Sequence, residues 1–118
     1  MAHGGPLRYY ADDPELASQL LTDYTGATLD DQTRAILDYA LLLTVDPSAT
    51  RESDVEALRA VGLTDEQVLS TVVATSEFAF FTRVADGLGV EVPESMERGV
   101  RRWLSGPALD QDWLVHPK

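Results

Sequence analysis

The sequence predicts an all-α protein built around one long helix, from Thr64 to Leu88. Apolar residues in this stretch recur at the three- and four-residue spacing of a helix, and no strand-like pattern of useful length occurs elsewhere. Capping residues, glycines and prolines divide the rest of the chain into shorter helical segments. At 1.5 Å per residue, a helix of about 24 residues is roughly 36 Å long, which makes it the central element of a domain this small.

The long helix begins with a capping box and carries one carboxylate within its apolar surface. Thr64 and Gln67 are spaced so that each side chain satisfies a free backbone N–H group of the other. The apolar residues that follow cover more than one stripe of the helix. Glu77 lies four residues after Val73 and four before Phe81, so the three side chains point the same way. Glu77 is therefore the residue that interrupts this apolar face.

Start and stop residues place the other expected helices. An Asp, Ser or Thr N-cap or a proline in the first turn marks a start, and glycine or an Asp-Pro pair marks an end. The second helix is expected to be capped by Thr28 or Asp30, and the third by Thr50 or Ser53. Residues 1–12 are typical of a loop or of the frayed end of a helix. The expected helices span residues 14–24, 31–44, a short segment ending at 61, 64–88 and 94–104.

Composition limits the functions that this chain can have. Its 118 residues are enough for one core, and we expect a helical domain over residues 1–107 followed by a tail over 108–118. Twenty acidic and nine basic residues give a net charge of −11, which disfavours nonspecific nucleic-acid binding. Because the chain contains no cysteine, it has no disulfide and no thiolate nucleophile of its own.

Other functional classes lack their sequence signals. The first ten residues have neither a positively charged start nor an apolar core, so no signal peptide is expected. The longest fully apolar runs, such as residues 40–43, are too short to span a bilayer, and a cytoplasmic protein is expected. His3 and His116 stand at opposite ends of the chain without the spacing of a metal site. No phosphate-binding loop or hydrolase motif is present, so neither a cofactor nor a metal is expected.

Glu77 is the sharpest internal candidate for chemistry. A carboxylate on an apolar face has a shifted proton affinity and can serve as a general acid or base. The alternatives are an ion pair with Arg34 or Arg83, or a contact between subunits. The three arginines of segment 94–104 either hold an anionic ligand or form a solvated face.

Four sequence phrases occur in a characteristic order. They are AILDYA at 35–40, LTxDP at 43–47, DVEALRxxGLTDEQV at 54–68 and FxxxxRxADxxGV at 78–90. Each phrase alone describes only a capped helix. Together, over about residues 3–92, they resemble the carboxymuconolactone decarboxylase/alkylhydroperoxidase superfamily. More narrowly, they resemble the C-terminal half of its peroxidase-related proteins.

The resemblance implies an orthogonal bundle of five or six helices that forms a homo-oligomer. In that family a Cys-x-x-Cys-x-x-x-His motif with an upstream glutamate reduces hydroperoxides through its two thiols. His3 is similar to the histidine of that motif, which would place both cysteines ahead of Met1. A degenerate second copy of the same unit would put Asp54 at the histidine position, and Thr50 and Pro47 at the two cysteine positions.

Three hypotheses follow. In the first, the chain is a helical oligomerising domain that is inactive as a thiol peroxidase on its own. In the second, it is an N-terminally shortened antioxidant hydroperoxide reductase. In the third, it is a cysteine-free acid/base enzyme of the decarboxylase type, acting on an unknown small molecule through His3 or Glu77. Related family members tend to carry asparagine where this chain has Ala79 and Thr82, so asparagine-like pocket contacts are not expected there.

Overall fold

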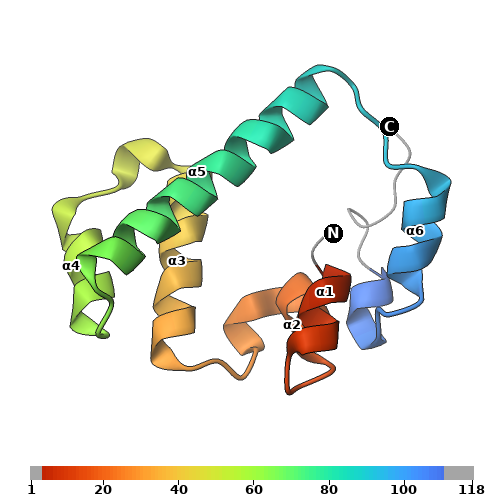
Figure 1. Ribbon diagram of the computed structural model, residues 1–118, viewed down its shortest axis with the longest axis horizontal. Coiled ribbons are helices and arrows are strands. Elements are labelled where there is room, and N and C mark those ends of the chain that lie inside the picture. Colours follow the sequence, from red (N-terminus) through yellow and green to blue (C-terminus); the bar gives the residue numbers. More distant parts are fainter. Residues whose placement is uncertain (1–3, 111–118) are drawn as a thin grey trace. The chain divides into compact units, whose positions relative to one another are not determined.

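The computed structural model describes residues 4–110, and this part of the chain is all-α, with six α-helices and no strand (Figure 1). The all-α prediction is therefore confirmed. The chain divides into two compact units. One unit is formed by residues 29–90, and the other by the described residues that precede Leu29 and follow Val90.

The unit of residues 29–90 consists of α3 (Asp31–Val45), a 3₁₀ turn η2 (Pro47–Ala49), α4 (Glu52–Ala60) and α5 (Asp65–Gly87). The three α-helices pack against one another, and α5 runs on past the other two (Figure 1). The core of this unit therefore lies near the start of α5. Its buried residues are Tyr39, Leu58, Leu63 and Val68.

Side-chain caps determine where α3 and α5 begin. The Asp30 carboxylate accepts the backbone N–H of Thr33 at 2.8 Å and is the cap of α3. Thr64 and Gln67 form the predicted capping box. The Gln67 backbone N–H donates to Thr64 Oγ1 at 3.2 Å, and the Thr64 backbone N–H donates to Gln67 Oε1 at 2.8 Å. These bonds satisfy donors that have no partner within the helix.

The start of α4 differs from the prediction. Arg51 is its N-cap residue, instead of Thr50 or Ser53. The Asp54 carboxylate reaches back three residues and accepts the Arg51 backbone N–H at 2.7 Å, so a carboxylate inside the helix fixes this start. The end of α4 is as expected, because Gly62 follows it with φ of +94°, a value that favours glycine.

The other unit contains α1 (Gly4–Tyr10), α2 (Leu16–Asp23), η1 (Tyr24–Gly26), α6 (Glu94–Arg101) and η3 (Gly106–Asp110). Here α1 is a helix where the sequence left a choice between a loop and a frayed helix end. The core of this unit is small. It consists of Val100, Leu104 and Ala108, with Leu21 and Trp103 packed against them.

Two boundaries in this unit differ from the predicted ones. The helix expected from residue 14 begins at Leu16, because the Asp13 carboxylate accepts the Glu15 backbone N–H at 2.8 Å and holds a turn there. The helix expected to reach residue 104 ends at Arg101. Residues 108–110, which the sequence assigned to the tail, belong to η3, and Ala108 is buried.

We predict that Leu58→Ala destabilises the unit of residues 29–90 by about 3 kcal/mol, because it leaves a cavity in a packed core. Leu58 is 1% exposed. Urea unfolding followed by circular dichroism measures the loss. Leu41→Ala is the matched control, since Leu41 is 49% exposed and its truncation should cost less than about 1 kcal/mol. Equal losses in the two variants would contradict the placement of the core.

The Asp30 cap should make the stability of α3 depend on pH. Hydrogen bonds from the Thr33 backbone and then from its hydroxyl lower the pKa of Asp30 below its ordinary 3.8. A carboxyl whose pKa is lower in the folded state stabilises the fold above its unfolded pKa, and this stability is lost as pH falls through the folded pKa. Asp30→Ala should therefore lower the unfolding midpoint at neutral pH and converge on the unsubstituted protein in acid.

Asp30→Asn is the control for this prediction, because asparagine caps helices without titrating. It should keep most of the neutral-pH stability and reduce the dependence on pH. Thermal unfolding followed over a pH series measures both effects. If Asp30→Ala lowers the midpoint by the same amount at every pH, the cap does not act through its charge.

Candidate functional site

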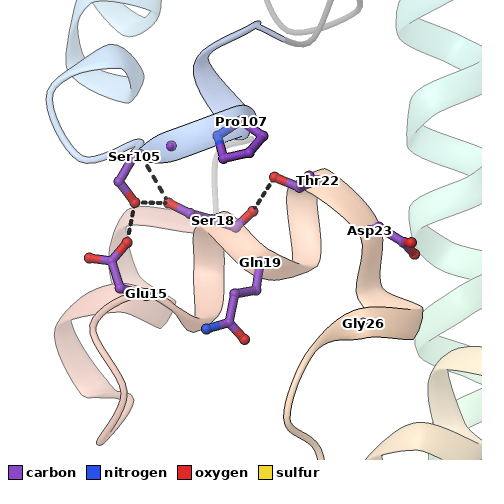
Figure 2. Close-up of a pocket in the computed structure, with 9 residues that line it drawn as sticks. Glu15, Ser18, Gln19, Thr22, Asp23, Gly26, Ser105 and Pro107 are labelled. Atoms are coloured by element: carbon purple, nitrogen blue, oxygen red, sulfur yellow. Dashed lines mark hydrogen bonds between the residues drawn. The ribbon is translucent and has the colours of Figure 1, made fainter.

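Three surface hollows of the described residues each lie within a single unit. The first, of about 400 Å³, lies between α2 and the turn before η3 (Figure 2). Ser105 Oγ hydrogen-bonds to the Glu15 carboxylate and, at 3.1 Å, to Ser18 Oγ, and the Ser105 backbone N–H donates to Ser18 Oγ at 3.2 Å. Thr22 Oγ1 donates to the Ser18 carbonyl at 2.9 Å. These hydrogen bonds join two segments of the unit that are distant in the sequence.

The second hollow, of about 210 Å³, lies between α3 and α4 and includes Asp54. The resemblance puts Asp54 at the position of the catalytic histidine, but its carboxylate holds the Arg51 N–H at the start of α4. Pro47, at one cysteine position, opens η2. Thr50, at the other, has a buried hydroxyl for which the described residues supply no hydrogen-bond partner. No pair of reacting groups is assembled by these three residues.

The third hollow is a groove of about 540 Å³ between α3 and α5. Ala79 and Thr82, the two positions singled out by the resemblance, both line it. Arg83 brings the positive charge, and its Nη1 donates to the Ala79 carbonyl at 3.1 Å. The full lining is Ala40, Thr44, Thr75, Phe78, Ala79, Thr82 and Arg83. A positive group beside small and aromatic side chains suits an anionic molecule with an apolar body.

Glu77 is exposed and is not among the residues that line these hollows. Thr75 and Ala79, each two positions from it, face the groove, and residues two apart on a helix point to nearly opposite sides. Within residues 4–110 Glu77 forms no salt bridge, so neither Arg34 nor Arg83 pairs with it. Of the interpretations drawn from the sequence, the subunit contact is the one that this position fits.

Around Glu77, the side of α5 turned away from the groove is apolar and open. We call the six large side chains there the outward face of α5. None of them is buried, although the sequence analysis expected this helix to be the central element of the domain. The outward face consists of Leu69 (62% exposed), Val73 (54%), Phe80 (61%), Phe81 (56%), Val84 (43%) and Leu88 (77%).

By length and composition alone, α5 could also cross a bilayer. Serine and threonine residues, together with Glu77 and Arg83, divide the helix into short apolar pieces, so it contains no long uninterrupted apolar run. Core helices of soluble proteins meet the same criterion, so the cytoplasmic location stays a prediction.

The remaining sequence candidates are placed as follows. His3 lies outside the described residues, as does His116. Arg98 lies 3.1 Å from the carboxylate of Glu94, and Arg101 lies 3.7 Å from that of Glu97. Both are i,i+4 pairs on an exposed helix, which favours a solvated face over an anion site.

Comparison with known proteins assigns no family. No family model matches the chain, and no curated protein matches it significantly. The resemblance to the carboxymuconolactone decarboxylase/alkylhydroperoxidase superfamily therefore stays a prediction that rests on the order of four phrases.

Proposed function

We propose that this chain is a self-associating helical domain of the alkylhydroperoxidase-like kind, whose copies pack through the outward face of α5. The observation that carries the proposal is the exposure of six large apolar side chains around a single carboxylate. Single exposed apolar residues are common in proteins, but a contiguous apolar patch of this size marks an interaction surface. In the assembled form α5 becomes the covered centre of an orthogonal bundle, as the resemblance implies.

The size of the patch suits a second copy of the chain. Six half-exposed large side chains present roughly 600 Å² of apolar surface, at about 100 Å² each. A stable interface takes about 800 Å² from each partner, so the outward face supplies most of one. A two-fold axis brings the same face of two copies together, and no second kind of patch is then needed.

Charge and composition argue against the other occupants. A net charge of −11 disfavours nucleic acid and anionic lipid surfaces. The carboxylate of Glu77 lies near the middle of α5, where a lipid bilayer would penalise it by several kcal/mol. With no cysteine, the chain has no thiol with which to attack a hydroperoxide.

Glu77 has a defined place in this proposal. Val73, Glu77, Phe80 and Val84 are spaced alternately by four and three residues, which is the core spacing of helices that pack along their length. A polar residue at one core position sets the register and number of the helices and lowers their stability. Glu77 would then set the register in which two copies of α5 pack, and it would weaken the affinity of the copies for each other.

Val84→Asp tests the interface by placing a second carboxylate in the outward face. We expect self-association at least tenfold weaker, because an unpaired charge would be enclosed. Sedimentation equilibrium across the micromolar range measures it. Val45→Asp is the matched control, since Val45 is 73% exposed at the end of α3 and receives the same charge. A stable wild-type monomer at these concentrations, or equal weakening in both variants, would refute the proposal.

Glu77→Gln should have the opposite effect. Removing the charge lowers the cost of enclosing the side chain, and we expect association to strengthen up to about tenfold. Glu52→Gln removes the same charge from an exposed position on α4 and should leave association nearly unchanged. The same sedimentation experiment compares the three proteins. No change in Glu77→Gln would place Glu77 outside the interface.

A further inference from the structure

We propose that the groove between α3 and α5 binds a small carboxylate with an aromatic or aliphatic body. The carboxylate would lie on the Arg83 guanidinium, and its body against Ala40, Phe78 and Ala79. This is a ligand site in addition to the self-association described above. All the groups that form it belong to the unit of residues 29–90.

The groove has the size of a small-molecule site. Its volume of about 540 Å³ falls within the range of roughly 300–1,000 Å³ that ligand pockets occupy. Two alanines and one aromatic ring form much of the wall, and their apolar surfaces suit a hydrocarbon body. Such sites combine apolar walls with a few polar groups that fix the orientation of the ligand.

The hydrogen-bonding groups of the wall point to an anion. Thr44 Oγ1 donates to the Ala40 carbonyl at 2.7 Å, and Thr75 Oγ1 donates to the Thr71 carbonyl at 2.8 Å. Both hydroxyl protons are therefore engaged within their own helices, and these two threonines offer no donor to a ligand. The donors that remain along the wall are the Thr82 hydroxyl and the guanidinium of Arg83, and Arg83 is the one that carries positive charge.

Arg83 has donors to offer. One N–H group bonds the Ala79 carbonyl, and a guanidinium has five N–H donors in all. Within residues 4–110 Arg83 forms no salt bridge, whereas Arg59 of the same unit lies 2.7 Å from the Asp65 carboxylate. In a chain with 20 acidic residues, an arginine that lines a groove and has no acidic partner in the described part of the chain is available to a ligand carboxylate, which it can hold through two parallel bonds.

The groove is separate from the outward face. Thr75 and Ala79 line the groove, and Glu77 between them lies on the other side of α5. Copies that pack through the outward face would leave the groove side of α5 open. Ligand binding and self-association can therefore succeed or fail independently.

Titration of the ¹⁵N-labelled full chain with 3-phenylpropionate tests the proposal by NMR. We expect amide shifts concentrated at the groove residues, with saturation in the micromolar to millimolar range. The neutral 3-phenylpropionamide and the cationic 3-phenylpropylamine should bind at least tenfold more weakly, since neither has a carboxylate for Arg83. Absence of shifts in the groove, or equal binding of the amide or the amine, would overturn the assignment.

Arg83→Gln should weaken 3-phenylpropionate binding about tenfold, and Arg83→Lys, which keeps the charge, should weaken it less. Arg102→Gln, an exposed position of the other unit, removes the same charge and should bind like the unsubstituted protein. Binding by Arg83→Gln equal to that of the unsubstituted protein, or equal loss in both Gln variants, would overturn the role of Arg83.

Ala79→Leu tests the groove itself, because the larger side chain fills it. This variant should abolish the amide shifts while the self-association constant is unchanged. Circular dichroism confirms that each variant is folded.

Discussion

The packing of α3 and α4 against the first turns of α5 is the constraint on which the unit of residues 29–90 depends. Leu58 is almost completely enclosed, and Tyr39, Leu63 and Val68 surround it. Val68 is the buried residue that α5 contributes, and it lies one turn after the cap at Thr64, so the cap and the core lie at the same end of the helix. The later turns of α5 are helical because of propagation from this anchored start. The groove side and the outward face of these later turns are consequently available for contacts with other molecules.

Local chemistry in the sequence predicted much of this unit. The Thr64–Gln67 capping box and the glycine after α4 each depend on residues that are close together in the sequence, and both are present in the structure. The cap of α4 was missed because a hydroxyl at Thr50 or Ser53 has the usual chemistry, yet the bond that fixes this start comes from the carboxylate of Asp54. A backbone N–H group bonds to the acceptor that lies within hydrogen-bond distance. The path of the chain between η2 and α4 sets the distance between the Arg51 N–H and each candidate acceptor.

Burial was the property that the sequence could not predict. Periodicity shows which side chains of α5 share a side, but it does not show whether a partner covers that side. The pattern therefore grouped Val73, Glu77 and Phe81 correctly and left their environment open. The groove had no motif to mark it. Its threonines and alanines resemble any helix surface, and only the arrangement of α3 beside α5 brings Thr44 close to Thr75 and Arg83.

The charges on α5 separate its two sides chemically. Glu77 stands alone among large apolar side chains, so enclosing it is costly and any packing there must be specific about register. Arg83 stands at the edge of a groove in which the hydroxyl protons of Thr44 and Thr75 are already bonded, so an anion is the partner that gains most from its positive charge. Glu77, surrounded by apolar groups, favours a helix surface of matching shape and charge. Arg83, beside the groove, favours a small carboxylic acid. The same helix can therefore hold copies of the chain together on one side and bind a ligand on the other.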